Sequence, residues 1–399
     1  MDRVILHCDC NGFYASVEEM QQPALRQVPM AVAGDPDSRH GIILAKNELA
    51  RRCGVQTAET IWQARCKCPE LVCVPPHHEL YRDLSRRINT LYLEYTDLVD
   101  PFGIDESFLD VTGSPALKRM TPPALADELR RRVRETYGVT ISVGVSFCRV
   151  LAKLGSDYRK PDATTVIGRP ELETLVWPLP VSALLYAGRR TTEALEAMGI
   201  RTIGQLAAAD RLEVGCRLGK AGDQLWRYAN GQDSERVRSW YEPRPLKSVG
   251  NGMTFRRDLT GEAALRPAVS ALADQVAVRL RAHSVRCTTV QLQIKSPTFR
   301  TVQRQQKLAH ATWLHRELTE TAMALLRAHW SPAAPVRALT ITAADLVPAA
   351  EAAEQADLFE DPAERARREK LSRLEDAVAG IRGRYGRGAI SYGPGKQEK

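Results

Sequence analysis

The sequence has no uncharged apolar stretch of about 18 residues, the length that a helix needs to cross a membrane, so no membrane-spanning helix is expected. The first residues, MDRVILHCDCNGF, contain one arginine, and their apolar run ends at Asp9. They lack the long apolar core and the small-residue cleavage site of a signal peptide. We therefore expect a cytoplasmic protein.

The sequence also lacks the paired C-x-x-C spacing that is typical of zinc sites. It has nine cysteines, an odd number, and two C-x-C pairs, Cys8/Cys10 and Cys66/Cys68. A secreted disulfide framework is excluded on this pattern. Neither a structural zinc site nor a disulfide is expected, and most of these cysteines are interpreted as small core residues.

The general composition is that of a folded protein. Of the 399 residues, 44% are hydrophobic and 26% are charged, so general disorder is excluded. The length predicts two or three domains, or four if they are small. The net charge of +8 is uneven, because residues 247–347 hold 14 Lys and Arg against 6 Asp and Glu, and the remaining sequence is neutral. A basic segment beside a neutral body favours a polyanionic partner such as nucleic acid, although a solvated basic surface is the alternative.

Apolar periodicity predicts an α+β protein. We expect strands over 3–9, 28–34, 41–47 and 139–147, a strand–turn–strand over 102–113, and helices over 13–25, 48–55, 79–98 and 124–138. Without residues 12–78, the order of these elements is that of a split βαβ sheet with helices on one face. Residues 12–78 would then be an insertion.

The second half of the sequence changes character twice. Residues 168–232 contain short segments with helical spacing that end at glycines, which indicates a small helical module. Residues 233–246, with two prolines, are expected to be a linker. Strands return within 247–347 around helices expected at 263–282 and 313–328, and 348–399 should be a partly ordered tail.

Three acidic residues stand where apolar strands end. Asp9 ends the first predicted strand, and Asp105 and Glu106 lie at the centre of FGIDESFLD. Neighbouring strand residues point to opposite faces, so the chain must turn at 105–106 if both carboxylates are to share a metal ion. Two Mg²⁺ ions on such acids support in-line phosphoryl transfer. The alternative is that the acids merely end strands. Asp110 is interpreted as a solvated residue or a turn cap.

These motifs resemble the Y-family DNA polymerases, in particular their bacterial polymerase IV branch. The resemblance rests on segments 7–19, 45–55, 102–112, 141–167 and 247–258, which occur in the family's order. It implies an α+β, multidomain, right-handed polymerase. The implied parts are a split βαβ palm (1–11 and 79–167), small fingers (12–78), a helical thumb (168–232), a linker (233–246), an α/β little finger (247–347) and a tail (348–399).

The resemblance also implies roles for individual residues. Asp9, Asp105 and Glu106 match the catalytic metal-binding acids, with the backbone carbonyl of Cys10 as a further ligand and two Mg²⁺ per site. Glu106 would help the primer 3′-hydroxyl to lose its proton. Tyr14 matches the steric gate against ribonucleotides, and Phe13 precedes it beside the dNTP, although its ring is expected to pack within its helix. Arg51 and Lys160 match the triphosphate-binding residues.

Two residues differ from those that the family usually carries at the same positions, and the role of one lysine is undecided. Asn11 replaces an acid that many relatives carry, but this position is not a required metal ligand. Glu48 replaces a common tyrosine near the triphosphate, so it should either point away or be compensated by a neighbour such as Lys46. Lys153 could face the same site or be structural.

Several segments are candidates for contacts with DNA or with a sliding clamp. Residues 184–200 and 218–226 resemble helix-hairpin-helix motifs, although plain helical packing is an equal alternative. Six residues are candidate phosphate contacts: Lys247, Arg256, Arg257, Lys295, Arg300 and Arg304. The segment QADLF resembles the bacterial clamp-binding motif through Gln355, Leu358 and Phe359. The helix expected after it, over 362–386, could pack locally or meet DNA.

The resemblance thus implies an error-prone translesion DNA polymerase that lacks proofreading, acts as a monomer on primer–template DNA and dNTPs, and gains residence on DNA from the clamp. A non-catalytic accessory protein is the first alternative, but such relatives typically lose the metal-binding acids. A nucleotide cyclase on a similar palm is the second, but it needs neither a basic DNA-binding module nor a clamp motif.

Overall fold

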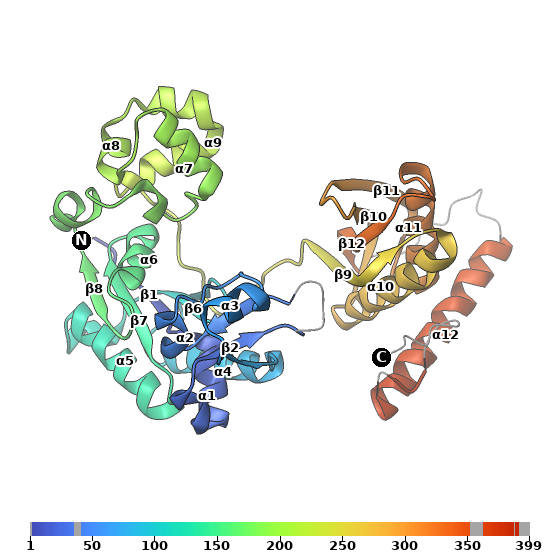
Figure 1. Ribbon diagram of the computed structural model, residues 1–399, viewed down its shortest axis with the longest axis horizontal. Helices are drawn as coiled ribbons and strands as arrows, with labels where there is room; N and C mark the ends of the chain where they lie inside the picture. Colours follow the sequence, from blue (N-terminus) through green and yellow to red (C-terminus); the bar gives the residue numbers. More distant parts are fainter. Residues whose placement is uncertain (1, 36–40, 352–361, 387, 391–399) are drawn as a thin grey trace. The chain divides into compact units, whose positions relative to one another are not determined.

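The computed structural model describes residues 2–35, 41–351, 362–386 and 388–390. The chain divides into two compact units, 1–243 and 244–399 (Figure 1). Within the described ranges, no helix combines the length and the apolar character needed to cross a membrane.

A five-stranded sheet is the centre of the first unit. Its strands lie in the order β5 (Val99–Pro101), β6 (Glu106–Asp110), β1 (Ile5–Cys10), β7 (Ile141–Ser146) and β8 (Thr164–Ile167). Strand β1 is antiparallel to both of its neighbours, and β8 is parallel to β7. The strands predicted from the apolar runs 3–9 and 139–147 are confirmed.

Helices cover both faces of this sheet (Figure 1). Helices α4 (His78–Tyr92) and α5 (Pro122–Tyr137) pack on the face that carries Leu6, and α6 (Arg149–Tyr158) packs on the face that carries Ile5. The expectation of helices on one face only is therefore wrong. Every residue of β1 and β7 is buried, so each face of these strands needs an apolar cover.

The acidic hairpin is displaced from its predicted position. The first strand of the pair is Val99–Pro101, and residues 102–105 form the turn, so the apolar residues of FGI are turn residues. Helix α4 correspondingly ends at Tyr92, six residues before its predicted end at 98. Leu98 therefore packs beside the sheet, and its helical spacing with the apolar residues of α4 is coincidental. Asp110 accepts from the backbone N–H of Thr112, which confirms a turn cap.

Residues 13–74 form a smaller layer. Helix α1 (Phe13–Gln21) and a 3-10 turn (Pro23–Gln27) are followed by a three-stranded sheet in the order β3 (Ile43–Lys46), β2 (Met30–Ala33) and β4 (Val72–Val74). Helices α2 (Glu48–Arg52) and α3 (Ile61–Lys67) connect β3 to β4. Helix α3 was not predicted, although Thr60 and Gln63 form a capping box at its start.

The rest of the first unit is helical and then extended. Helices α7 (Arg189–Ala197), α8 (Ile203–Ala208) and α9 (Arg211–Ala229) follow short turns at 172–176 and 181–183, and a further 3-10 turn lies earlier, at Pro115–Lys118. Gly219 has φ 63° and ψ −145°, which breaks α9 into two helices inside the second helix-hairpin-helix candidate. Residues 233–243 lack regular structure, but Val237 is buried against Ile5 and Phe108. The first part of the expected linker is thus packed on the sheet.

The second unit is a four-stranded antiparallel sheet covered by helices. The order is β11 (Thr301–Thr312), β10 (Val285–Lys295), β12 (Val336–Pro348) and β9 (Ser248–Leu259). Helices α10 (Glu262–Ala282) and α11 (His315–His329) form the core with the sheet. The strands and both helices predicted here are confirmed.

The end of the chain contributes one more helix, α12 (Pro362–Tyr385). Its Glu375 is 4% exposed and accepts from Arg281 on α10 at 2.6 Å and from the backbone N–H of His315 at 3.1 Å. Arg382 donates to Asp274 on α10 at 2.9 Å. The helix therefore packs locally, and whether it also meets DNA stays a prediction.

Candidate active site

Asp9 and Glu106 meet because β1 and β6 are neighbours. They are directly opposite each other in the antiparallel register, and carboxylate oxygens of both lie within 4.8 Å of each other and of a ring nitrogen of His7. Asp105 ends the turn just before β6, and its carbonyl accepts from the backbone N–H of Cys10 at 2.9 Å. The chain turn that the shared site requires at 105–106 is therefore present.

Strand alternation decides which side chains face this site. Cys8 and Cys10 point into the core below α4, whereas His7 and Asp9 point toward α6. Asp9 is 3% exposed. The backbone of Cys10 lies at the acidic corner, so its carbonyl stays a candidate ligand.

The ammonium groups of two lysines lie against these carboxylates. Lys153 Nζ lies 3.0 Å from Asp9, 3.2 Å from Glu106 and 3.1 Å from Asp157. Lys160 Nζ lies 2.7 Å from the same Asp9 oxygen and 2.7 Å from Asp157. The predicted residue Lys160 is therefore at the site. Lys153, whose role the sequence left undecided, contacts Asp9 and Glu106 directly.

The charges at the corner shift the ionisation of its members. Burial and the neighbouring negative charges of Asp9 and Glu106 raise the pKa of Asp105 to about 6. For Glu106, burial alone would raise the pKa, but His7 and Lys153 outweigh it and lower the pKa. For Lys153 and Lys160, burial opposes the charge, yet the surrounding carboxylates raise both pKa values. The corner is an electrostatic well for cations.

His7 supports Glu106 from behind. Its Nδ1 lies 2.8 Å from the hydroxyl of Ser156, and this hydroxyl lies 2.8 Å from the carbonyl oxygen of Lys153. Its Nε2 lies 3.3 Å from Glu106. Burial is the main cause that lowers the pKa of His7, although Glu106 opposes this. The histidine thus helps to position Glu106 and Lys153.

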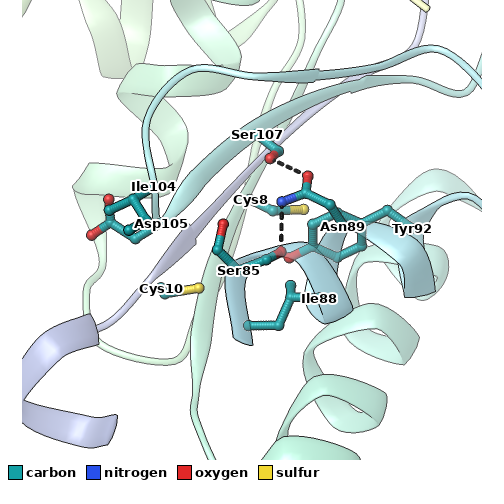
Figure 2. A pocket seen from close by; sticks show the side chains of 9 residues that line it. All are labelled: Cys8, Cys10, Ser85, Ile88, Asn89, Tyr92, Ile104, Asp105 and Ser107. Carbon is teal, nitrogen blue, oxygen red and sulfur yellow. Dashed lines mark hydrogen bonds between the residues drawn. The ribbon is translucent and has the colours of Figure 1, made fainter. Parts of the chain in front are cut away.

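A water-sized cavity of about 10 Å³ lies behind the acidic turn (Figure 2). Asp105 and Cys10 line one side, and Asn89 and Tyr92 of α4 line the other. Ser107 donates to Asn89 at 2.6 Å, which ties β6 to α4. In Figure 2 the carboxylate of Asp105 points away from Asn89. The cavity is too small to hold a nucleotide. The residues that line it instead support the acidic turn.

The two aromatic residues of α1 have different environments. Phe13 is 2% exposed and packs in the core, so the expectation of helix packing is confirmed, and a contact of this residue with the dNTP stays a prediction. Tyr14 is half-buried and stacks on Tyr81 with a centroid distance of 4.2 Å. Burial and the charge of Asp105 raise the pKa of Tyr14. Tyr14 therefore lies close enough to the acidic corner for the charge of Asp105 to affect its ionisation.

Arg51 is engaged by Glu48 on α2. Its guanidinium donates to both carboxylate oxygens at 2.7 and 2.8 Å, and Arg52 donates to the same residue at 3.1 Å. The two arginines lower the pKa of Glu48 to about 2, with the hydrogen bond from Arg51 as the largest cause. Of the two alternatives, compensation by a neighbour is observed, but it comes from Arg51 and Arg52, while Lys46 donates to Thr57. Arginines three and four residues along the helix reach Glu48 more easily.

Asn11 connects β1 to β7 instead of serving the acids. Its amide donates to Thr140 at 3.1 Å and its carbonyl oxygen accepts from Ser142 at 2.9 Å. A carboxylate could not donate to Thr140, so the amide suits this position.

The candidate DNA contacts of the second unit do not share one face. Alternation along the strands places Arg256 and Lys295 on the open face of the sheet, and Arg257 and Arg304 on the side of the helices. All except Lys295 are exposed, including Lys247 before β9 and Arg300 in the β10–β11 turn. The clamp-motif residues Gln355, Leu358 and Phe359 lie outside the described residues.

Sequence reasoning missed one charged residue of this site and left the role of another undecided. Asp157 bridges Lys153 and Lys160, and Lys153 is the most central cation. The signal was present, because residues 153, 157 and 160 have the three- and four-residue spacing of one helix face.

Comparison with known proteins agrees with this geometry. Residues 8–157 match the model of the impB/mucB/samB family, and residues 246–358 match that of the impB/mucB/samB family C-terminal domain. A curated relative, "DNA polymerase IV" of Acetivibrio thermocellus, is 42% identical over 393 residues, with 98% of this chain and 97% of the relative covered. "DNA polymerase IV 1" of Bacillus subtilis is 38% identical, with 90% and 85% covered.

A solved structure has the same fold. A Y-family DNA polymerase chimera superposes with a TM-score of 0.76 at 21% identity and covers 86% of this chain and 99% of its own. The expected α+β multidomain architecture of a right-handed polymerase is thus confirmed. On the strength of the family models and the full-length relatives, this chain belongs to the impB/mucB/samB family of Y-family DNA polymerases, in its DNA polymerase IV branch.

Proposed function

We propose that this chain is a template-directed, error-prone translesion DNA polymerase that extends a primer 3′-hydroxyl with deoxynucleotides and has no proofreading activity. The observation that carries the proposal is the convergence of Asp9, Asp105 and Glu106 at one corner of the central sheet. In the subdomain assignment that we propose, this sheet is the palm, residues 12–78 are the fingers, 168–232 the thumb and 247–347 the little finger.

The acidic corner suits two Mg²⁺ ions. Its donors are carboxylate oxygens, which hard divalent cations prefer. Burial and the charges of Asp9 and Glu106 raise the pKa of Asp105, which supports a place for cations at the corner. Asp9, Asp105, Glu106 and the carbonyl of Cys10 would hold the ions. When bound, Mg²⁺ would neutralise charge at the reacting phosphate and favour ionisation of the primer hydroxyl.

The protein's own groups would then act on the two substrates. The primer 3′-oxygen attacks the α-phosphorus of the dNTP, the bond to the bridging oxygen breaks and pyrophosphate leaves. Glu106, held ionised by its lowered pKa, accepts the hydroxyl proton. Lys160 and Arg51 hold the triphosphate after exchanging their present partners, Asp9 and Glu48, for phosphate oxygens. Tyr14 limits the space at the sugar.

The second unit would hold DNA mainly through its charge. A net charge of +8 in residues 247–347 supports salt-dependent binding to phosphates without sequence preference. The six exposed or half-buried basic residues named above are the candidate contacts. We propose in addition that the protein works as a monomer and that Gln355, Leu358 and Phe359 bind the sliding clamp of the replicative polymerase.

Primer extension with Mg²⁺ on a primed template tests the activity. Asp105→Ala should lower the rate by at least about a hundredfold, because a charge at the reacting centre is lost. Asp110→Ala is the matched control, since Asp110 caps a turn outside the corner. If the wild type extends no primer, the accessory-protein alternative is favoured. Persistence of a mismatched 3′-end in the absence of dNTPs tests the lack of proofreading.

Two further assays test the finer assignments. Tyr14→Ala should raise ribonucleotide incorporation relative to deoxynucleotide incorporation by about tenfold or more, with Phe13→Leu as control. An unchanged ratio would show that Tyr14 is not the gate. Replacing Leu358 and Phe359 by alanine should abolish capture on immobilised clamp, and undiminished capture would reject the motif.

A further inference from the structure

A second cluster of metal-binding side chains lies in the smaller layer, away from the acidic corner. It consists of Cys53, Cys68 and Glu70, whose two sulfur atoms and one carboxylate oxygen all lie within 4.8 Å of one another. The three residues come from different local structures. Cys53 caps the C-terminus of α2, Cys68 caps the C-terminus of α3, and Glu70 lies in the turn before β4.

The backbone holds the three residues in place. The N–H of Cys53 donates to the carbonyl of Leu49, and that of Cys68 donates to the carbonyl of Ala64 at 2.9 Å. The N–H of Leu71 donates back to the carbonyl of Cys68 at 3.0 Å, which closes the turn that carries Glu70. The ligand atoms therefore sit on ordered backbone.

The donor set is that of zinc. Two thiolates and one carboxylate are common zinc ligands, and Zn–S bonds of about 2.3 Å give tetrahedral sulfur–sulfur edges of about 3.8 Å. Contraction of the present cluster by an ångström or less would reach such edges. Three protein ligands leave the fourth position to water. Cys68 is buried, but Cys53 is half-buried and Glu70 is exposed, so an ion has a route from solvent.

The three side chains also interact with one another. The thiol of Cys68 lies within hydrogen-bonding reach of both Cys53 and Glu70. A divalent cation held by the three groups would neutralise their negative charges when the thiols are ionised. No zinc spacing was evident in the sequence, because 14 residues separate Cys53 from Cys68.

We propose that Cys53, Cys68 and Glu70 form a binding site for one Zn²⁺ or similar thiophilic divalent cation, which fastens the end of α2 to the end of α3. The site is independent of the acidic corner, which offers no thiolate in the described structure. Because α2 also carries Arg51, the ion would stiffen the helix that the proposed triphosphate contact belongs to.

Cobalt titration of the full-length, reduced protein tests the site without any polymerase assay. One equivalent of Co²⁺ should produce thiolate-to-metal charge-transfer absorption, which carboxylate-bound Co²⁺ at the acidic corner cannot give. One equivalent of Zn²⁺ should bleach it. Cys53→Ser should abolish the band, and Glu70→Gln should weaken Co²⁺ binding by about tenfold or more.

Matched variants distinguish this site from the other cysteines and from misfolding. Cys66→Ser and Cys216→Ser remove exposed thiols outside the cluster and should leave the absorption unchanged. Circular dichroism of Cys53→Ser confirms that the variant is folded. Absence of the band in the wild type, or its retention in folded Cys53→Ser, would overturn the proposal. Neither result bears on primer extension, so the proposed polymerase function is tested separately.

Discussion

Lys153 is the residue whose removal should affect the acidic corner most. Its ammonium group contacts Asp9, Glu106 and Asp157 at 3.0 to 3.2 Å, and its side chain is only 14% exposed. Lys153→Met keeps most of the volume of the side chain but removes the charge. Asp9 and Asp157 would then share the single ammonium group of Lys160, and Glu106 would keep His7 as a neighbour.

The expected loss follows from the burial of these partners. Removal of one member of a buried ion pair costs about 3–5 kcal/mol, because the remaining charge is left without compensation. We expect the lower end, about 3 kcal/mol, since Lys160 stays 2.7 Å from both Asp9 and Asp157. At roughly 2–4 °C per kcal/mol for a unit of this size, the Tm should fall by about 6–12 °C.

Thermal unfolding in EDTA and in Mg²⁺ provides the measurement. Mg²⁺ should stabilise Lys153→Met more than it stabilises the wild type, because the ion replaces the missing positive charge. Arg131→Met is the control, since its exposed pair with Glu135 should contribute about 0.5 kcal/mol or less. A variant as stable as the wild type in EDTA, or one that gains nothing extra from Mg²⁺, would refute the electrostatic account.

Three other substitutions test separate parts of the structure. Asp105→Asn should raise the free energy of unfolding in EDTA at pH 8 by about 2–3 kcal/mol, because a pKa raised from 3.8 to about 6 makes the charged form oppose folding. The difference between variant and wild type should shrink as the pH falls from 6 to 4 in urea unfolding, and a pH-independent difference would contradict this origin. Glu48→Gln should release Arg51 and lower the KM for dNTP about twofold with kcat unchanged, since the competing partner is an exposed helix pair; an unchanged KM in steady-state kinetics would mean that Arg51 does not bind the triphosphate. Gly144→Ala should cost about 3 kcal/mol or more, because the added Cβ would lie 1.9 Å from the carbonyl oxygen of Ala152. Gly383→Ala, where a Cβ meets nothing within 4 Å, is the control for soluble yield and urea unfolding, and equal stability of the two variants would disprove the close approach of α6 to β7.

Sequence patterns that lie within a single strand, helix or turn predicted that element well. The apolar run before Asp9 identified β1, the spacing up to Gly138 identified α5, and Gly138 has the left-handed φ of 68° that its capping role requires. The turn at 105–106 was inferred from the need of two adjacent acids to share a site. Each of these inferences depends only on neighbouring residues along the chain.

Features that depend on contacts between distant elements were predicted less well. The position of β5 was misplaced, because an apolar turn over 102–104 has the same local composition as a strand. The cover of both sheet faces was missed, since α6 lies in sequence beyond the acids whose face it completes. Lys153 was left unassigned for the same reason: its spacing with Asp157 indicates a helix face but not what that face meets.

The sequence alone determined which residues carry the chemistry of this chain. These residues are carboxylates at the ends of apolar strands, phosphate-binding cations and a basic segment, and each can be recognised from neighbouring residues in the sequence. Tertiary structure decided how those residues are charged and whom they contact. Asp9 opposes Glu106 only through the pairing of β1 with β6, and the two lysines reach them only through the packing of α6. Electrostatic energies depend on distance and burial, and neither quantity exists until the chain has folded.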